Sequence, residues 1–349
     1  MSSPKVVVIT GASAGVGRAA AWRFAEDGAR IGLIARGRPG LEAAKREVEE
    51  RGGEALVLPV DVSDAAEIDA AASAVEEAFG PIDVWVNDAM VTIYAEFTGI
   101  EPEEFERATH VTYLGTVWGT RAALKRMRPR NRGAIVQVSS ALAYRGIPLQ
   151  SAYCGAKHAV KGFTESVLTE LLHHGSNVRV SMVQLPGLNT PQFTWGRTKL
   201  PKQTQPVPPI FQPEIAADAI HFCAHTGRRE LFVGAPTVKT ILGEKLVPRL
   251  VDAYLARKGY DAQQTDRPLD PEQHDNLFAP VEEDRGAHGP FDDQARSPQP
   301  PVPARDEPRL GSAGRPRGGR GRRARDRRDP NLRRSEPWPS RYPTSSSSD

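Results

Sequence analysis

Short apolar runs alternate with amphipathic helical patterns over the first two thirds of the chain. Seven runs rich in β-branched residues predict buried strands, at 5–9, 30–34, 55–60, 82–86, 134–138, 178–183 and 230–233. Patterns with helical spacing lie between them, at 16–27, 40–51, 64–79, 101–127, 152–173 and 213–225. This alternation predicts an α/β fold with a doubly wound parallel sheet of about seven strands and helices on both faces.

A glycine-rich turn connects the first strand to the first helix. The strand at Lys5 to Ile9 continues directly into Thr10-Gly11-Ala12-Ser13-Ala14-Gly15-Val16-Gly17, and the helical pattern starts inside this run. Glycines let a backbone approach a pyrophosphate closely, and a helix N-terminus offers free N–H donors and a positive dipole. A turn without a ligand is the alternative, but the strand and the helix on either side favour a dinucleotide site.

The end of the second strand indicates which dinucleotide is bound. A site for NAD(H) usually places a carboxylate there, against the ribose hydroxyls of the adenosine. In this chain Ala35 occupies that place and is followed by Arg36 and, after Gly37, by Arg38. A guanidinium can pair with the 2′-phosphate of NADP(H) through two parallel hydrogen bonds. We therefore expect NADP(H) in preference to NAD(H); the alternative is that both arginines lie in a solvated loop.

Ser140, Tyr153 and Lys157 are the candidate catalytic residues in the middle of the chain. Tyr153 and Lys157 are four residues apart at the start of a helical pattern, so one helix face carries both side chains. A lysine cation stabilises a nearby phenolate and lowers the phenol pKa from about 10, which makes it a usable acid or base. Ser140 follows the apolar strand 134–138, where its hydroxyl can hold a carbonyl oxygen.

Together these elements resemble the short-chain dehydrogenase/reductase family. The matching motifs are the turn at 10–17, Asp61-Val62, Ser140 and Tyr153-Cys154-Gly155-Ala156-Lys157, and the resemblance covers residues 4–235. It implies a Rossmann-type sheet, a nicotinamide cofactor and hydride transfer between that cofactor and a carbonyl or an alcohol. It also implies that Tyr153 exchanges the proton, that Lys157 lowers the Tyr153 pKa and holds the nicotinamide ribose, and that Ser140 positions the substrate oxygen.

The same resemblance implies a set of cofactor contacts. Asp61 would contact the adenine through its side chain and Val62 through its backbone, and Thr190 would contact the carboxamide of the nicotinamide. The other positions that match the family's cofactor-binding motifs are Gly11, Ser13, Gly15, Val16, Gly17, Asn87, Ala89, Pro186 and Gly187.

The chain departs from the family's pattern at three places. Met90 ends the run Asn87-Asp88-Ala89-Met90, where the family usually has a glycine close to the nicotinamide. Thr112 takes the place of the family's fourth catalytic residue, an asparagine, so we expect a hydroxyl with less hydrogen-bonding capacity in the proton relay. The loop from Pro186 to Thr190 is one residue shorter than the family's Pro-Gly-x-x-x-Thr pattern, so its path must differ.

Residues 187–213 predict a substrate-binding loop. This proline-rich stretch carries Phe193, Trp195, Ile210 and Phe211 at the position where the family covers the nicotinamide. Aromatic side chains there would line a pocket; alternatively, they pack a small subdomain onto the core. Four further residues are candidates for the wall of the same pocket: Met90, Leu142, Tyr144 and Leu185. Together with the side chains of 187–213, they favour an apolar substrate.

The composition limits the class of protein. Only two cysteines occur, Cys154 and Cys223, which is typical of a reducing compartment without a disulfide framework. The first strand begins within five residues of the start, so no signal peptide is expected, and no apolar stretch has transmembrane length. We expect a cytoplasmic protein. The eight histidines suggest no metal-ligand spacing, so no metal site is expected.

The C-terminal part has a different composition. A catalytic domain is expected over residues 1–260. Its last part, 238–257, has an amphipathic helical pattern with four alternative roles: packing on the domain, covering the substrate, mediating oligomerisation or lying on a membrane surface. Residues 261–349 are rich in Pro and Arg and predict disorder. Residues 296–349 contain 14 arginines and six acidic residues, a net of +8, whereas the whole chain is +3 and residues 1–295 therefore carry −5. Without interleaved aromatic residues for base stacking, this tail is not expected to bind nucleic acid.

The sequence therefore predicts an NADP(H)-dependent oxidoreductase that interconverts a carbonyl and a secondary alcohol, with Tyr153 as general acid/base. Two alternatives stay open: a weakly active or inactive cofactor-binding sensor or scaffold, and an interaction protein that acts through its Arg-rich tail. The resemblance also implies a homo-oligomer, a dimer or tetramer, formed through the helices at 101–127 and 152–173.

Overall fold

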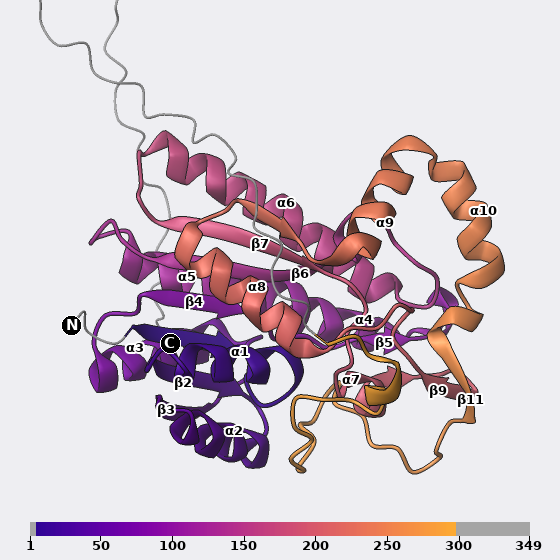
Figure 1. Cartoon of the computed structure of the whole chain (residues 1–349), viewed down its shortest axis with the longest axis horizontal. Helices are drawn as coiled ribbons and strands as arrows, with labels where there is room; N and C mark the ends of the chain where they lie inside the picture. Colours follow the sequence, from indigo (N-terminus) through magenta and orange to yellow (C-terminus); the bar gives the residue numbers. More distant parts are fainter. Residues whose placement is uncertain (1–4, 298–349) are drawn as a thin grey trace, which may run out of the picture. The chain divides into compact units, whose positions relative to one another are not determined.

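The computed structural model describes residues 5–297, and its centre is a seven-stranded parallel sheet (Figure 1). The strand order is β10-β7-β6-β4-β1-β2-β3, so the chain reverses its direction of travel across the sheet between β1 and β4. This is the doubly wound Rossmann-type arrangement that the sequence predicts. The strands of the sheet are β1 (Val6–Thr10), β2 (Arg30–Ala35), β3 (Glu54–Pro59), β4 (Val84–Asn87), β6 (Ala134–Ser140), β7 (Arg179–Leu185) and β10 (Glu230–Phe232).

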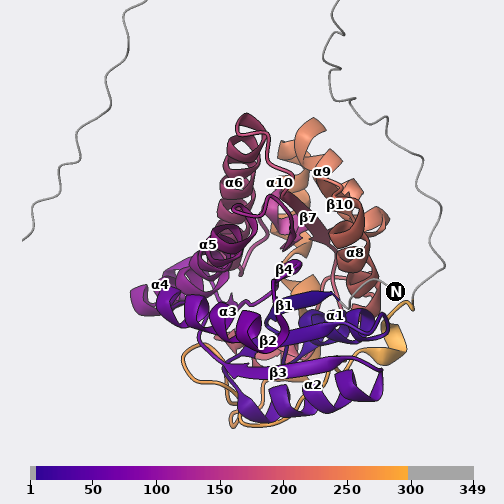
Figure 2. The ribbon, with the colours of Figure 1, turned by 90° about the vertical axis from the view of Figure 1, so that its left-hand side faces the viewer.

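Helices cover both faces of this sheet (Figure 2). One face carries α1 (Gly15–Ala25), α2 (Arg38–Glu50) and α8 (Pro213–Thr226), and the other carries α3 (Ala65–Phe79), α5 (Gly115–Met127) and α6 (Ser151–His173). Successive side chains of β1 alternate between two apolar cores: Val7 and Ile9 belong to the first, and Val6 and Val8 to the second. Burial on both faces explains why the strands appear in the sequence as continuous apolar runs.

The helix expected over 101–127 is interrupted. The structure has α4 (Pro102–Thr109), a π-helical turn η2 (His110–Leu114) and then α5. The turn places Thr112 against the loop after β4, where its hydroxyl donates to the carbonyl of Val91 (2.9 Å) and accepts from its N–H (3.1 Å). At Gly115 a Cβ would lie 2.6 Å from Cγ2 of Val62, so the start of α5 also approaches the loop after β3 closely. Periodicity alone does not reveal such a one-residue insertion.

Residues after β7 build a small layer beyond the ends of the strands. They form α7 (Gln192–Trp195), β8 (Arg197–Thr198) and β9 (Lys202–Thr204), and β8 pairs with β5 (Ile93–Tyr94). Further on, α9 (Gly234–Leu246) and α10 (Pro248–Lys258) form two consecutive helices that project from the domain (Figure 1). Short 3-10 turns complete the described chain: η1 (Phe97–Gly99), η3 (Ala141–Ala143), η4 (Asp261–Gln263) and η5 (Asp292–Gln294).

The ordered chain continues past residue 260, which differs from the expected boundary and from the disorder expected after it. β11 (Gln264–Pro268) pairs with β9, and the side chains of Leu277 and Phe291 are buried. Isolated buried residues without periodicity give no sequence signal, which explains the difference. The Arg-rich stretch, its expected disorder and its expected lack of nucleic-acid binding lie outside the described residues.

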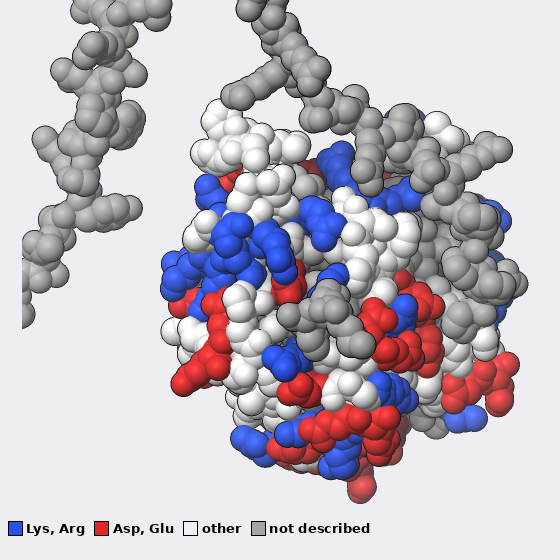
Figure 3. All heavy atoms as spheres, turned by 60° about the vertical axis from the view of Figure 1, so that its left-hand side comes forward, with Lys and Arg blue, Asp and Glu red and all other residues white. Residues whose placement is uncertain are grey.

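The surface of the described domain mixes both signs of charge. Lys and Arg side chains lie among Asp and Glu on the face in Figure 3, apart from one larger basic group at its edge. No helix among residues 5–297 is long and apolar enough to cross a membrane.

Candidate active site

One cavity of about 700 Å³ lies at the carboxyl ends of the parallel strands. Its walls come from the residues that follow β1, β2, β4, β6 and β7, so it spans the point where the strand order reverses. Ligands of open α/β sheets bind at this place, because the loops there diverge and leave a crevice. Most predicted site residues line the cavity; they are Gly11, Ser13, Gly15, Val16, Arg36, Asp61, Val62, Ala89, Ser140, Tyr153, Lys157, Pro186, Gly187 and Thr190.

Three predicted site residues are not among those that line the cavity. Gly17 allows close packing, because a Cβ there would lie 2.4 Å from the carbonyl oxygen of Gly11. Thr112 is fully buried, and its hydroxyl is engaged with Val91. Both residues therefore support the cavity wall through packing and hydrogen bonds without lining the cavity themselves. The structure does not place the Thr112 hydroxyl in a proton relay.

Asn87 is the third of these residues, and it belongs to a buried polar network inside the sheet. Its amide nitrogen donates to Oε1 of Gln137 (2.9 Å) and to the hydroxyl of Thr120 (3.2 Å), and its Oδ1 accepts from the indole of Trp85 (2.8 Å). A Cβ at Gly119 would lie 2.1 Å from that Oδ1, so the neighbouring helix closes the network. Asn87 fixes the end of β4 rather than contacting a ligand in the cavity.

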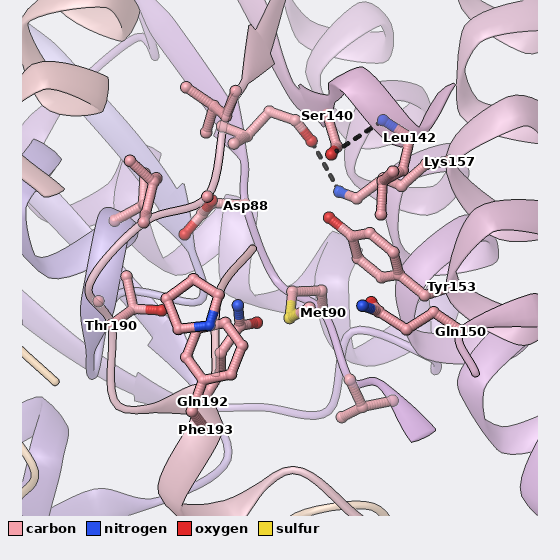
Figure 4. Close-up of a pocket in the computed structure, with 18 of the residues that line it drawn as sticks. Asp88, Met90, Ser140, Leu142, Gln150, Tyr153, Lys157, Thr190, Gln192 and Phe193 are labelled. Carbon is pink, nitrogen blue, oxygen red and sulfur yellow. Dashed lines mark hydrogen bonds between the residues drawn. The ribbon is translucent and has the colours of Figure 1, made fainter. Parts of the chain in front are cut away.

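Ser140, Tyr153 and Lys157 converge on one end of the cavity (Figure 4). Ser140 ends β6, and its Oγ accepts from the N–H of Leu142 (3.1 Å), which starts the turn η3. Tyr153 and Lys157 come from successive turns of α6, and the ammonium of Lys157 lies 5.6 Å from the centroid of the Tyr153 ring. Lys157 donates to the carbonyl of Val138 (2.8 Å), and this bond fixes its head group beside the end of β6.

The electrostatics of Tyr153 differ from the expectation. Burial raises the pKa of its phenol above the ordinary value, and the interaction with Ser140 acts in the opposite direction. Burial lowers the pKa of Lys157 to about 8, while the Asp88 carboxylate opposes this change. Lys157 donates to the Val138 carbonyl and forms no hydrogen bond with the phenol among the described residues, so burial dominates the pKa of Tyr153 there.

Asp88 is a cavity residue to which the sequence assigned no role. Burial raises the pKa of its carboxyl to about 7, and the Lys157 cation and the N–H of Gly17 oppose this shift. The carboxyl projects into the same space as the catalytic side chains (Figure 4). The only sequence signal was its place in the departure Asn87-Asp88-Ala89-Met90, where the family usually has a second asparagine.

The opposite end of the cavity is built around Arg36. Its guanidinium donates to three successive main-chain carbonyls, those of Asn276, Leu277 (3.4 Å) and Phe278 (3.0 Å). Burial and the nearby cation of Arg107 lower the pKa of Arg36. The salt bridges among the described residues include none to Arg36; the nearby Asp61 carboxylate, which pairs with Arg107, acts on the Arg36 pKa through its charge and raises it.

Residues 276–286, which we call the strap, cover this end of the cavity. The carbonyl of Leu277 accepts from Nε of Arg107 (3.0 Å), and the same guanidinium holds the Asp61 carboxylate (2.5 Å). Further along, the carbonyl of Gly286 accepts from the N–H of Gly15 in the glycine turn (3.2 Å). The strap therefore runs from the predicted adenine contact at Asp61 to the predicted phosphate contact at Gly15.

The residues of this end fit a dinucleotide. The cavity continues from the strap to Tyr153, and the half-buried Arg36 guanidinium, which forms no salt bridge among the described residues, lies where a 2′-phosphate would be expected. The side-chain oxygen Oδ1 of Asn276 is buried at the cavity and has no hydrogen-bond partner among the described residues. An unsatisfied buried acceptor is costly, and a polar ligand that donates to it removes that cost.

The catalytic end of the cavity is largely apolar. Met90, Leu142 and Leu185 line it as expected, and so do Phe193 and Trp195 from α7. Tyr144, Ile210 and Phe211 do not line it; Ile210 is buried in the packing of the small layer. Both interpretations of residues 187–213 therefore hold for different side chains of the same segment.

Polar residues that the sequence did not indicate also line this end. Gln150 and Gln192 flank the space between Tyr153 and Phe193 (Figure 4). The amide nitrogen of Gln150 donates to Oε1 of Gln263 (2.7 Å), which is fully buried. The partner comes from the segment after residue 260, so only the folded chain reveals this pair.

A second group of side chains has metal-ligating chemistry, away from the cavity. Ligand atoms of Asp27, His221 and His225 lie within 4.8 Å of one another, with the two histidines four residues apart on α8. The sequence analysis did not identify this spacing. A hydrogen bond between His221 and Asp27 (2.7 Å) accounts for the cluster without an ion.

A doubly wound sheet with a cavity at its carboxyl edge and a Ser-Tyr-Lys group inside that cavity defines the class of nicotinamide-dependent oxidoreductases. The model of the short chain dehydrogenase family matches residues 5–199 of the chain. The chain belongs to the short-chain dehydrogenase/reductase family.

Relatives of known sequence extend this comparison. The chain is 32% identical over 276 residues to the uncharacterized oxidoreductase YxnA of Bacillus subtilis, which covers 78% of both proteins. It is 33% identical to the 3-ketodihydrosphingosine reductase of Bos taurus over 57% of this chain and 61% of that enzyme. Estradiol 17-beta-dehydrogenase 11 of Mus musculus is 30% identical over 70% of this chain and 80% of its own length.

The comparison with a solved structure leads to the same family. A metagenomic short-chain oxidoreductase in complex with NADP superimposes with a TM-score of 0.55 at 29% identity, over 66% of this chain and 96% of that chain. The family and the fold agree on an oxidoreductase that uses a nicotinamide cofactor.

Proposed function

We propose that the protein is an NADP(H)-dependent oxidoreductase that interconverts a carbonyl and a secondary alcohol. One observation carries this proposal: a single cavity has Ser140, Tyr153 and Lys157 at one end and the half-buried Arg36 guanidinium at the other. A dinucleotide that lies along this cavity would have its nicotinamide beside the phenol and its adenosine phosphate beside the guanidinium.

The proposed chemistry divides between the cofactor and the side chains. The bound cofactor supplies or accepts the hydride. Ser140 donates a hydrogen bond to the substrate oxygen and orients it, and Tyr153 transfers its hydroxyl proton to that oxygen during reduction and takes it back during oxidation. Lys157, fixed by the Val138 carbonyl, keeps a cation beside the phenol and stabilises the phenolate as it forms.

The preference for NADP(H) follows from the charges around the strap. Arg36 and Arg107 lie close enough for one cation to lower the pKa of the other, and only Arg107 has a carboxylate partner, Asp61. A 2′-phosphate would supply the missing anion, whereas the 2′-hydroxyl of NAD(H) would not. The solved relative in complex with NADP supports the same preference.

The substrate is proposed to be apolar around its carbonyl. Met90, Leu142, Leu185, Phe193 and Trp195 surround the space next to Tyr153, and removal of an apolar substrate from water favours binding there. Two relatives, the 3-ketodihydrosphingosine reductase and estradiol 17-beta-dehydrogenase 11, are named for lipophilic substrates, which supports this class.

A cofactor-binding sensor or scaffold with weak or no activity is the second candidate. Met90 narrows the cavity near the catalytic residues, and the Thr112 hydroxyl lies outside it, which favours this alternative. The presence of Ser140, Tyr153 and Lys157 in one place favours the enzyme. A homo-oligomeric state and a cytoplasmic location stay predictions.

The test is a fluorescence titration of the full-length protein with NADPH and with NADH, followed by a panel of apolar and polar ketones. The proposal expects tighter binding of NADPH and NADPH oxidation with apolar ketones. Binding of NADPH without turnover of any ketone would favour the sensor, and absence of binding to both cofactors would refute both candidates.

A further inference from the structure

The helices α9 and α10, which we call the hairpin (residues 234–258), expose an unusual number of large apolar side chains. Leu246, Leu250 and Tyr254 are 75%, 69% and 65% exposed, and Val238, Leu242 and Val247 are also exposed. α10 contains no buried residue. Scattered apolar residues are normal on a surface, but a contiguous group of this kind marks an interaction site.

The charges around these apolar side chains are of one sign. Five exposed basic residues frame the group, namely Lys239, Lys245, Arg249, Arg257 and Lys258. The two acidic residues within α9 and α10, Glu244 and Asp252, each form an ion pair with Arg145 of the main domain (2.6 Å in both cases). Lys239 lines the cavity, and the Lys245 ammonium lies 5.8 Å from the centroid of the Tyr144 ring of the main domain. The hairpin therefore presents its exposed apolar side chains together with Arg249, Arg257 and Lys258, while its carboxylates attach it to the domain.

The other side of the hairpin forms part of the cavity wall. Thr240, Gly243, Val251 and Leu255 line the cavity, and Tyr254 both lines it and is exposed. The hairpin projects from the domain at the end of the sheet where β5, β9 and β11 lie (Figure 1). A surface that binds the hairpin thus lies next to the catalytic end of the cavity.

We propose that the hairpin docks on an anionic lipid bilayer and that the substrate reaches the cavity from that bilayer. Leu246, Val247 and Leu250 enter the boundary between head groups and acyl chains, and the exposed Arg249, Arg257 and Lys258 contact anionic head groups. Apolar side chains flanked by cations are the combination by which amphipathic helices bind such surfaces. The docking is independent of the proposed function, whereas the statement about the substrate rests on it.

A second copy of the chain is a less suitable occupant. Two hairpins that meet face to face would bring these three basic residues of each copy together without an acidic residue free to pair with them, since Glu244 and Asp252 are engaged with Arg145. Like charges across an interface oppose association. Anionic lipid supplies the complementary charge.

The docking is tested with the full-length protein and vesicles of phosphatidylcholine, with or without phosphatidylserine, in a flotation assay. Leu246→Ser combined with Leu250→Ser should reduce binding to the anionic vesicles at least tenfold. Leu172→Ser is the matched control, because Leu172 on α6 is equally exposed at 75%. The Arg-rich tail is present in all these proteins, so its own attraction to anionic lipid does not alter the comparison.

A second measurement reports the hairpin itself. Val247→Cys, labelled with an environment-sensitive fluorophore, should show a blue shift with anionic vesicles and a smaller one with neutral vesicles; both native cysteines are buried. Equal vesicle binding by the double variant and the control, or no spectral shift, would overturn the proposal. If the protein were a dimer that dissociates on the Leu246→Ser change, the proposal would also be overturned, and a second copy of the chain would be the occupant of this surface.

The substrate route is tested with one long-chain ketone embedded in vesicles and one soluble ketone. The double variant should lose at least tenfold in kcat/KM for the embedded ketone and keep its value for the soluble one, because Leu246 and Leu250 do not line the cavity. Equal losses for both ketones would contradict the route. Vesicle binding without turnover of either ketone would refute the proposed function and leave the docking intact.

Discussion

The guanidinium of Arg36 donates to the main-chain carbonyl of Asn276, a residue 240 positions further along the chain. Arg36 directly follows β2, inside residues 5–199, which match the family model, whereas Asn276 lies outside them. The strap therefore fixes the residue that we expect to select the cofactor. Carbonyl oxygens orient a guanidinium without neutralising it, which leaves the charge available to a phosphate.

Arg36→Ala should weaken NADPH binding by about tenfold or more, because a charge-assisted hydrogen bond to phosphate contributes roughly 1.5–3 kcal/mol. NADH binding should change little, since NADH lacks the phosphate. Fluorescence titration with both cofactors measures the difference. Arg38→Ala is the control: Arg38 is exposed and pairs with Glu42 (3.2 Å). Equal losses for both cofactors would show that Arg36 does not read the phosphate.

Tyr153→Phe should lower kcat by about 10²-fold or more, the usual scale for removal of a general acid or base. The ring and its packing stay, so the dissociation constant for NADPH should remain within a factor of about three. Steady-state kinetics and titration together separate the two effects. Tyr113→Phe, at a tyrosine that does not line the cavity, serves as the control. Turnover near the wild-type rate would exclude Tyr153 from the proton transfer.

The elements of the sheet could be predicted because buried parallel strands and amphipathic helices have strong periodic patterns. Asn87 could not be assigned in the same way: its side chain belongs to the network of Trp85, Thr120 and Gln137, and only the sheet brings these together. Thr112 fits the family's spacing, yet the π-helical turn directs its hydroxyl to Val91. Spacing specifies which residues are near a site, and the local backbone decides where their side chains point.

The folded structure of the segment after residue 260 could not be predicted from the sequence, for a different reason. Its attachment depends on side chains that bond to distant backbone, such as Gln263, which donates to the carbonyls of Pro148 (2.9 Å) and Gly259 (2.7 Å). Such bonds leave no period in the sequence, and a composition rich in polar residues and proline then resembles that of a disordered chain.

Gln263→Leu should therefore destabilise the protein by about 2–5 kcal/mol, since it leaves buried carbonyls and the Gln150 amide without partners. Gln150 lines the cavity beside Tyr153, so the KM for the ketone should also change at a temperature where the variant is folded. Urea unfolding and steady-state kinetics measure the two effects. Gln264→Leu, at the more exposed neighbouring position, is the control. A Gln263 variant as stable as this control would contradict the importance of the buried amide.

Asp88→Asn should make stability less dependent on pH. The Asp88 pKa is raised to about 7 in the folded protein, against about 4 in an unfolded chain, so the folded state binds more protons between these values. The free energy of unfolding of the wild type then falls as the pH rises through that window, by at most about 1.4 kcal/mol per pH unit. The Asn variant lacks this contribution, so its stability relative to the wild type should grow from pH 4 to pH 7 and level off above.

Lys157 adds a second effect of opposite sign at higher pH. Its pKa is lowered to about 8 from the ordinary value of 10.5, so above about pH 8 the unfolded chain binds more protons and stability rises with pH. Asp88 raises the Lys157 pKa, and its removal should shift the start of this rise to lower pH. Urea unfolding of both proteins from pH 4 to pH 10 measures both windows. A constant difference between the two curves would show that Asp88 is ionised throughout, with its charge fully compensated in the folded protein.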